Sequence, residues 1–132
     1  MPGGPHFFVD WSLGRIRVPG RLRANGWYLT TLAEHYGIPA DEDVTDIEWL
    51  ALAGTRGWAV LMKDDRIRRR PAELAALKVA GVHAFCIANA NLDTDHQVEV
   101  LLRHQEQIFH RCTEPGPTLD SLSKTGMRPI SL

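Results

Sequence analysis

Residues 45–65 read TDIEWLALAGTRGWAVLMKDD, and this stretch decides the fold. Thr45 followed by Glu48 three residues later is the capping-box signature of a helix N-terminus. We expect that helix to end at Gly57, because glycine is the usual residue just past a helix C-terminus. Residues 58–62 are then a continuous apolar run, which is typical of a strand buried on both faces. A helix followed by a buried strand is the building block of a parallel α/β sheet.

The same alternation of strands and helices extends outward from this stretch in both directions. We expect strands over 6–9, 27–31, 58–62 and 82–87, and helices over 14–24, 32–36, 45–56, 71–80 and 94–110. Residues 118–123 and 127–131 are two short candidate strands around a Lys124-Thr125-Gly126 turn, which predicts a C-terminal β-hairpin. The sequence therefore predicts a single α/β domain over residues 1–132 with a mainly parallel sheet. Its core covers about 6–112, and a tail or hairpin covers 113–132.

Length, composition and charge exclude several classes of protein. The 132 residues fit one domain, and 44% apolar and 23% charged residues are ordinary for a soluble globular protein. No run approaches the ~20 apolar residues of a membrane span, and the N-terminus lacks the features of a secretory signal. Cys86 and Cys112 do not make a disulfide framework, so we expect a reducing, cytoplasmic location. A net charge of −1 argues against a general nucleic-acid coating protein but allows a local basic patch.

Acidic residues stand where the predicted sheet ends. Asp10 ends the first strand, Asp64 and Asp65 follow the strand over 58–62, and Asp46 opens the helix before that strand. The carboxyl ends of parallel strands lie along one edge of a sheet, where ligand sites form. Asp46 also shares the apolar stripe of its helix and so faces inward. We therefore expect Asp10, Asp46 and Asp64 to converge although they are far apart in sequence.

Three converging carboxylates repel one another unless a cation neutralises them. An all-oxygen ligand set favours Mg²⁺ or Mn²⁺ over zinc, and such an ion can activate a water for phosphodiester hydrolysis. Asp65 is expected to support the ligands from outside, because adjacent residues point apart, and Asp43 could reach a second metal. Each acid alone also has an ordinary explanation as a turn residue or as a helix N-terminal acid. Their joint placement at one edge favours the metal site.

Two groups of arginines flank the predicted acidic edge. Arg66, Arg68, Arg69 and Arg70 follow the strand over 58–62 directly, while Arg15, Arg17, Arg21 and Arg23 follow the first strand. A basic rim around an acidic centre suits a polyanion, since the rim holds phosphates. We expect Arg66, Arg68, Arg69, Arg70 and Arg15 to contact RNA, although a solvated helix face explains the group at 15–23 equally well.

The remaining polar residues give weaker signals. Glu34, Asp41 and Glu42 are expected to be solvated. Trp11, next to Asp10, either stacks on an unpaired base or packs in the fold. The six histidines have no metal-ligand spacing, and the cysteines have no histidine in a nucleophile pattern.

These residues resemble a known family. FFVDWSLG (7–14) and TDIEWLALAGTRGWAVLMKDDRIRRRPAEL (45–74) are similar to the PIN-like nuclease domain, in the compact form of VapC-like toxins from bacterial toxin–antitoxin pairs. The resemblance implies a three-layer α/β/α fold and a metal pocket of Asp10, Asp46 and Asp64. It also implies a Mg²⁺- or Mn²⁺-dependent ribonuclease that acts on RNA, is often a homodimer, and is held inactive by a cognate antitoxin.

The chain departs from the family pattern at two positions. Met62 stands where the family usually has Thr or Ser, and the family's Glu on an early helix has only Glu34 as a candidate. Two other classes are excluded by residues next to Asp10. Receiver domains need paired acids after the first strand, and haloacid-dehalogenase-type phosphatases need an Asp at position 12, which is Ser. The competing hypothesis is a non-catalytic PIN-like module that binds RNA or a protein partner.

Overall fold

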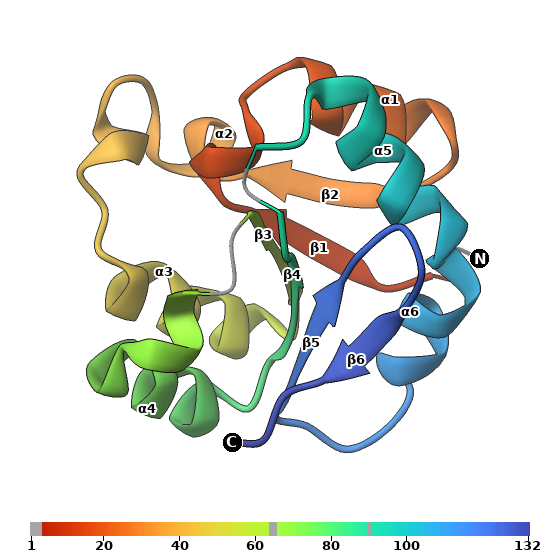
Figure 1. The fold of residues 1–132 in the computed structure, drawn as a ribbon. Helices are drawn as coiled ribbons and strands as arrows, with labels where there is room; N and C mark the ends of the chain where they lie inside the picture. Colours follow the sequence, from red (N-terminus) through yellow and green to blue (C-terminus); the bar gives the residue numbers. More distant parts are fainter. Residues whose placement is uncertain (1–3, 64–65, 90) are drawn as a thin grey trace.

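Six strands form one mixed sheet in the order β2-β1-β3-β4-β5-β6 (Figure 1). The computed structural model describes residues 4–63, 66–89 and 91–132. Neighbouring strands pair in parallel except for the antiparallel pair β5–β6. The strands are β1 His6–Val9, β2 Tyr28–Thr31, β3 Ala59–Lys63, β4 His83–Ile87, β5 Thr118–Leu122 and β6 Met127–Pro129. The predicted α/β class with a mainly parallel sheet and a C-terminal hairpin is confirmed.

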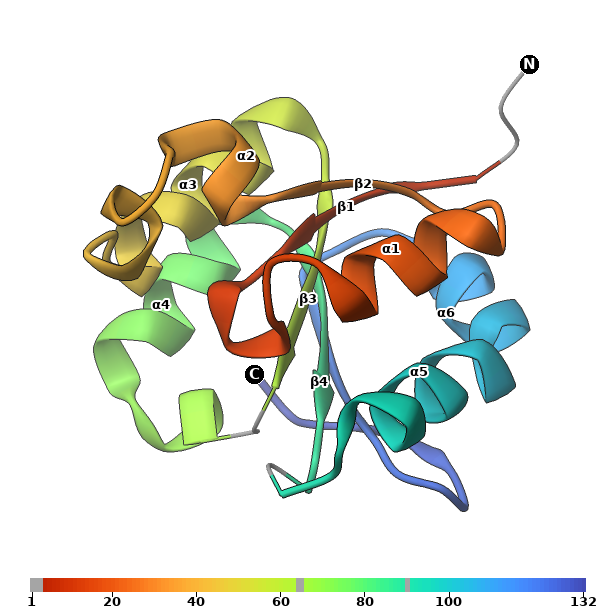
Figure 2. The same ribbon diagram turned by 90° about the horizontal axis from the view of Figure 1, so that it is seen from above.

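Helices cover both faces of the sheet and make three layers. Figure 2 shows α1, α5 and α6 on one side and α2, α3 and α4 on the other. The helices are α1 Arg17–Ala24, α2 Leu32–Tyr36, α3 Asp46–Arg56, α4 Pro71–Ala80, α5 Thr94–Arg103 and α6 Gln105–Arg111, with 3₁₀ turns η1 Trp11–Leu13, η2 Ala40–Glu42 and η3 Arg66–Arg69. Each face has its own buried cluster, one around Phe7, Leu61 and Phe85 and the other around Phe8, Trp49 and Val60. No helix in the described part of the chain is both long and apolar enough to cross a membrane.

Local signals fix the ends of the helices next to the site. The Thr45 hydroxyl accepts a hydrogen bond from the Glu48 N–H at 3.2 Å, as expected of an N-cap. Gly57 and Gly81 end α3 and α4 with φ of 70° and 71°, a left-handed conformation that glycine adopts without steric cost. Pro71 occupies the first turn of α4, as expected.

Two predicted helices are interrupted. The helix predicted over 14–24 begins later than expected, because α1 starts only at Arg17. Gly14, with a φ of 90°, ends the preceding 3₁₀ turn η1 and is not helical. The helix predicted over 94–110 breaks at His104 into α5 and α6. The buried His104 ring donates from Nε2 to the Ser123 carbonyl at 2.7 Å, a contact that ties the break to the hairpin. The apolar periodicity continues across this break and therefore predicted one helix.

The C-terminal residues are part of the sheet and not an appendage to it. β5 pairs in parallel with β4, and Leu119 and Leu122 are buried on opposite faces of the sheet. Arg111 at the end of α6 binds the buried carboxylate of Asp120 with Nε and Nη2, each at 3.1 Å. This bidentate pair holds α6 against β5.

Candidate active site

A cavity of about 250 Å³ lies at the carboxyl edge of the sheet, where β1 and β3 end and α3 begins. It is lined by acidic, basic, hydroxyl and aromatic side chains: Asp10, Trp11, Ser12, Asp46, Trp49, Met62, Lys63, Ile67 and Arg70. The parallel topology thus brings Asp10 and Asp46 to one hollow, although a strand, two helices and their loops separate them in sequence.

Asp10 directly follows β1 and is held in place by hydrogen bonds. Its N–H donates to the Leu61 carbonyl at 3.0 Å, so the backbone still follows the sheet at this residue. The Ser12 hydroxyl donates to Asp10 Oδ2 at 2.6 Å, and the Lys63 N–H donates to the same hydroxyl at 3.4 Å. Burial raises the pKa of Asp10, the Ser12 hydrogen bond opposes that shift, and the charge of Asp46 adds to it.

Asp46 is the first residue of α3 and its side chain is 33% exposed. The indole N–H of Trp49, one helical turn later, donates to Asp46 Oδ1 at 2.9 Å. Arg70 lies on the other side, with Nη1 3.8 Å from Asp46 Oδ2. The carboxylate is therefore held at the cavity wall with one oxygen next to a cation.

In the described part of the chain, none of the other predicted acids lines the cavity with Asp10 and Asp46. Asp64 and Asp65 lie outside the described residues. Asp43 is exposed at the end of η2 and does not line the cavity. Among the described residues, no group of three or more His, Cys, Asp or Glu side chains could hold a metal ion. The triad of Asp10, Asp46 and Asp64 therefore stays a prediction, with two members placed together.

One member of the dense arginine group lies at the cavity. Arg70 lines it, Arg69 is exposed, and Arg66 and Arg68 belong to the same 3₁₀ turn, η3. Their contact with RNA stays a prediction.

Arg15 makes intramolecular contacts that the sequence did not indicate. It binds Asp41 through Nε at 3.0 Å and Nη2 at 2.8 Å, and Glu42 through Nη2 at 2.5 Å. The Asp41 side chain is 0% exposed, so the expectation that Asp41 is solvated was wrong. The Arg15 guanidinium holds the pKa of Asp41 below its usual value. Because Arg15 and Asp41 come from different segments, this ion pair had no local signal.

Ser12, Trp49 and Lys63 were missed as site residues. Ser12 and Trp49 each bind an aspartate two or three residues earlier in the chain, and that short spacing was the available signal. Lys63 is the last residue of β3 and lines the cavity, and its side chain has no hydrogen bond or ion pair with the described residues. Lys63 thus adds a cation to the cavity that Asp10 and Asp46 line.

Two other potentially reactive side chains, Cys112 and Glu34, lie outside this cavity. Burial, with the charge of Asp120 adding to it, raises the pKa of Cys112 to about 12, so its thiolate is scarce at neutral pH. Glu34, the candidate for the family's helix glutamate, caps α2 and accepts a hydrogen bond from Arg23 at 2.6 Å.

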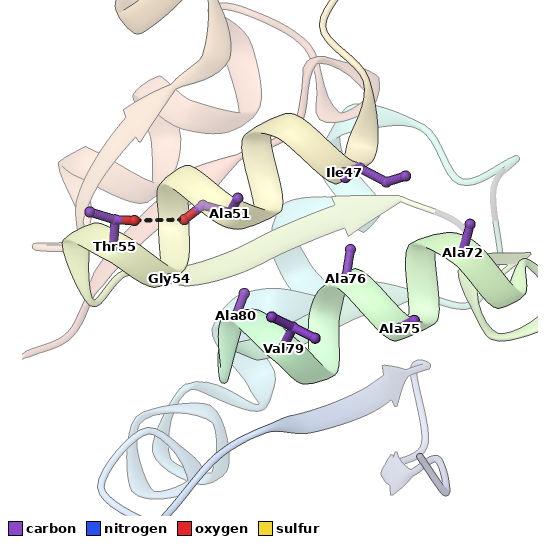
Figure 3. Close-up of a pocket in the computed structure, with 9 residues that line it drawn as sticks. All are labelled: Ile47, Ala51, Gly54, Thr55, Ala72, Ala75, Ala76, Val79 and Ala80. Atoms are coloured by element: carbon purple, nitrogen blue, oxygen red, sulfur yellow. Dashed lines mark hydrogen bonds between the residues drawn. The ribbon is translucent and has the colours of Figure 1, made fainter.

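A larger hollow of about 620 Å³ lies between α3 and α4 (Figure 3). Small and aliphatic side chains line it, among them Ile47, Ala76 and Val79, and the hydroxyl of Thr55 donates to the Ala51 carbonyl at 3.0 Å. None of its lining residues is ionisable. The larger hollow therefore offers no acid, base or carboxylate ligand among the residues that line it.

The three-layer fold and the acidic side chains at the carboxyl edge of its sheet agree with the comparison of the sequence with known families. The family model described as "PIN like domain" matches residues 5–89, and the chain belongs to this family. A relative from Mycobacterium tuberculosis (strain ATCC 25618 / H37Rv), "Putative ribonuclease VapC45", is 35% identical over 112 residues, which are 85% of this chain and 81% of the relative. No solved structure matches the chain. The resemblance to the VapC-like type of PIN domain is thereby confirmed.

Proposed function

We propose that this protein is a metal-dependent endoribonuclease that hydrolyses RNA phosphodiester bonds as the toxin of a toxin–antitoxin pair. Membership of the PIN-like family and a relative named as a ribonuclease support the proposal. The observation that carries it is the pairing of Asp10 and Asp46 in one cavity with the cations Lys63 and Arg70 beside them.

The donor chemistry of the cavity fits Mg²⁺ or Mn²⁺. Asp10 and Asp46 offer carboxylate oxygens, and Asp64 follows β3 by one residue. The burial and the neighbouring charge that raise the pKa of Asp10 are both relieved by a bound cation. When bound there, the ion would supply an activated water and neutralise developing charge on a phosphoryl oxygen.

The protein's own side chains orient the carboxylates and the substrate. The Ser12 hydroxyl holds Asp10 Oδ2 and the Trp49 indole N–H holds Asp46 Oδ1, so both carboxylates are oriented by residues close to them in sequence. Lys63 and Arg70 hold the phosphate diester at the cavity by charge. Trp11 is 48% exposed at the cavity wall and offers a face for an unpaired base next to that phosphate.

The partners we propose follow from the same activity. The substrate is RNA, and a cognate antitoxin protein restrains the enzyme. The location we propose is the cytoplasm, where its substrate is found. A homodimer stays a prediction.

The decisive experiment is cleavage of total RNA with Mn²⁺, followed by mapping of the new 5′ ends. Asp10→Asn and Asp64→Asn should each lower the cleavage rate by at least about 100-fold, because each removes a proposed metal ligand. The matched control Glu106→Gln removes an exposed carboxylate from α6 and should cleave like the wild type. Cleavage that persists in Asp64→Asn would overturn the assignment of the pocket.

A melting experiment separates the enzyme from a non-catalytic PIN-like module. Mn²⁺ at about 100 times its dissociation constant should stabilise the wild type by about 2.7 kcal/mol through linkage. Asp10→Asn should abolish this gain. If the wild type gains no stability and cleaves no RNA, the chain is a module that binds RNA or a protein.

A further inference from the structure

A second polar pocket of about 290 Å³ lies at the C-terminal hairpin, where β4 and β5 end. It is lined by three hydroxyl side chains, one arginine and small or apolar residues: Ser121, Ser123, Thr125, Arg128, Ala88, Gly126 and Met127. No carboxylate of the described residues lines it, so the pocket offers hydrogen-bond donors and one positive charge. That combination suits an anion.

Among the described residues that line this pocket, Ser121 and Arg128 have donor side chains without a hydrogen bond or ion pair. Ser121 is 4% exposed, and its hydroxyl makes no hydrogen bond with the described residues. Ser121 lines the pocket, so its hydroxyl can donate a hydrogen bond to a ligand bound there. Arg128 is exposed, and its guanidinium has no ion pair in the described part of the chain.

Neighbouring cations already have carboxylates close by. Arg103 binds Glu99 at 3.1 Å and donates to the Lys124 carbonyl at 2.7 Å. Contacts with His96 lower the pKa of Asp93, and the charge of Lys124 contributes to the same shift. Arg128, and neither Arg103 nor Lys124, lines the pocket, so it is the cation placed to bind an added anion there.

The strand register connects this pocket to the acidic cavity. Met62, Cys86, Ser121 and Arg128 are partners in one row across β3, β4, β5 and β6. Partners in a row present their side chains on the same face of a sheet. Strands are about 4.8 Å apart, so the row places Ser121 about 10 Å and Arg128 about 14 Å from Met62, which lines the acidic cavity. Both pockets thus share one face and one edge of the sheet.

We propose that the hairpin pocket is a second phosphate subsite for the RNA strand, bound by the Arg128 guanidinium and the Ser121 hydroxyl. The inference rests on the proposed ribonuclease function, because the anion it assigns is the backbone of the same substrate. A stacked strand advances about 3.4 Å per nucleotide, so the span from Met62 to Arg128 corresponds to about four nucleotides. The pocket therefore adds affinity for longer RNA and leaves a dinucleotide at the acidic cavity unaffected.

The test measures binding of a fluorescein-labelled dinucleotide and a mixed-sequence RNA decamer by anisotropy, with EDTA present so that no metal-dependent cleavage occurs. Arg128→Gln should weaken decamer binding about five- to tenfold at 50 mM salt and lower the salt slope by about 0.7, the value for one phosphate contact on a single strand. Ser121→Ala should weaken decamer binding about two- to fivefold without changing the salt slope, because it removes a neutral donor. Neither variant should change dinucleotide binding.

The matched control is Arg56→Gln, which removes the same charge from the end of α3 that precedes β3, at the opposite edge of the sheet. It should bind both RNAs like the wild type. Equal decamer affinity and salt slope in Arg128→Gln and wild type would overturn the subsite. RNA cleavage by the wild type in Mn²⁺ would then still support the proposed function. Conversely, a decamer effect without any cleavage would support the subsite while the nuclease proposal fails.

Discussion

Asp10 is the residue at which burial and function conflict. Its carboxyl group is held in a polar cavity beside a second carboxylate, and burial raises its pKa. In the absence of divalent ions, the native state therefore binds a proton more readily than the unfolded state. Between the unfolded pKa and the raised native pKa, the stability of the wild type falls as the pH rises.

We predict that Asp10→Asn is more stable than the wild type at pH 7 in EDTA, because burial and the charge of Asp46 raise the pKa of Asp10 and so destabilise its ionised form. The difference should shrink as the pH falls toward the unfolded pKa of aspartate, because the wild-type carboxyl group is then protonated. Urea unfolding from pH 4 to pH 8 measures it. Asp43→Asn, at an exposed position, should follow the wild-type profile. Parallel profiles for wild type and Asp10→Asn would show that Asp10 is not destabilised by its surroundings.

At the scale of single residues, the sequence predicted where Asp10 and Asp46 lie better than it predicted which side chains form ion pairs. The convergence of Asp10 and Asp46 follows from a general rule of parallel sheets, so it needs no knowledge of distant contacts. The burial of Asp41 by Arg15 depends on how two loops meet, and no periodicity records that. Asp64 is predicted from its position after β3, and it lies outside the described residues.

Among the elements, α3 and α4 are in close contact at a glycine, Gly54. A Cβ on Gly54 would lie 2.6 Å from the Ala80 carbonyl oxygen and 2.9 Å from the Ala80 Cβ. Real Cβ atoms do not approach a backbone this closely, so one helix must shift. That shift would disturb the packing of α3, which also carries Asp46.

We predict that Gly54→Ala destabilises the protein by about 1–3 kcal/mol, the usual cost of overpacking. The control Gly20→Ala lies in α1, where nothing is within 4 Å of the added Cβ, and should stabilise by about 0.5–1 kcal/mol through helix propensity. Thermal unfolding of both variants measures the contrast. A Gly54→Ala variant as stable as the wild type would mean that the two helices separate at little cost.

Elements were predictable where their ends carry local signals. Thr45, Gly57, Pro71 and Gly81 each act through their own backbone or side chain, so the bounds of α3 and α4 followed from the sequence. The break at His104 depends on a contact with Ser123, nineteen positions later. Such a break leaves the apolar periodicity of the helix intact, so the periodicity cannot predict it.

At the scale of the whole molecule, we expect the central strands of the sheet to be more stable against local unfolding than its edge strands. β1, β3 and β4 have a partner strand on each side, and their side chains are buried by helices on both faces. β6 is a three-residue edge strand with one partner, and Arg128 and Pro129 on it are exposed. The proposed catalytic acid Asp10 follows a central strand, whereas the proposed phosphate subsite lies on the edge.

We predict that amide hydrogen exchange is slowest in β3 and β4 and at least about 100-fold faster in β6, because edge elements open without global unfolding. Mass spectrometry of peptides covering 59–63, 83–87 and 127–129 measures the difference in metal-free protein. Addition of the RNA decamer should slow exchange in β6 when Arg128 engages a phosphate, and the variant Arg128→Gln should lose that protection. Equal exchange in β6 and β4 would place the hairpin in the central cooperative unit and would contradict the prediction that the proposed subsite lies on a more readily opened strand than the acidic cavity.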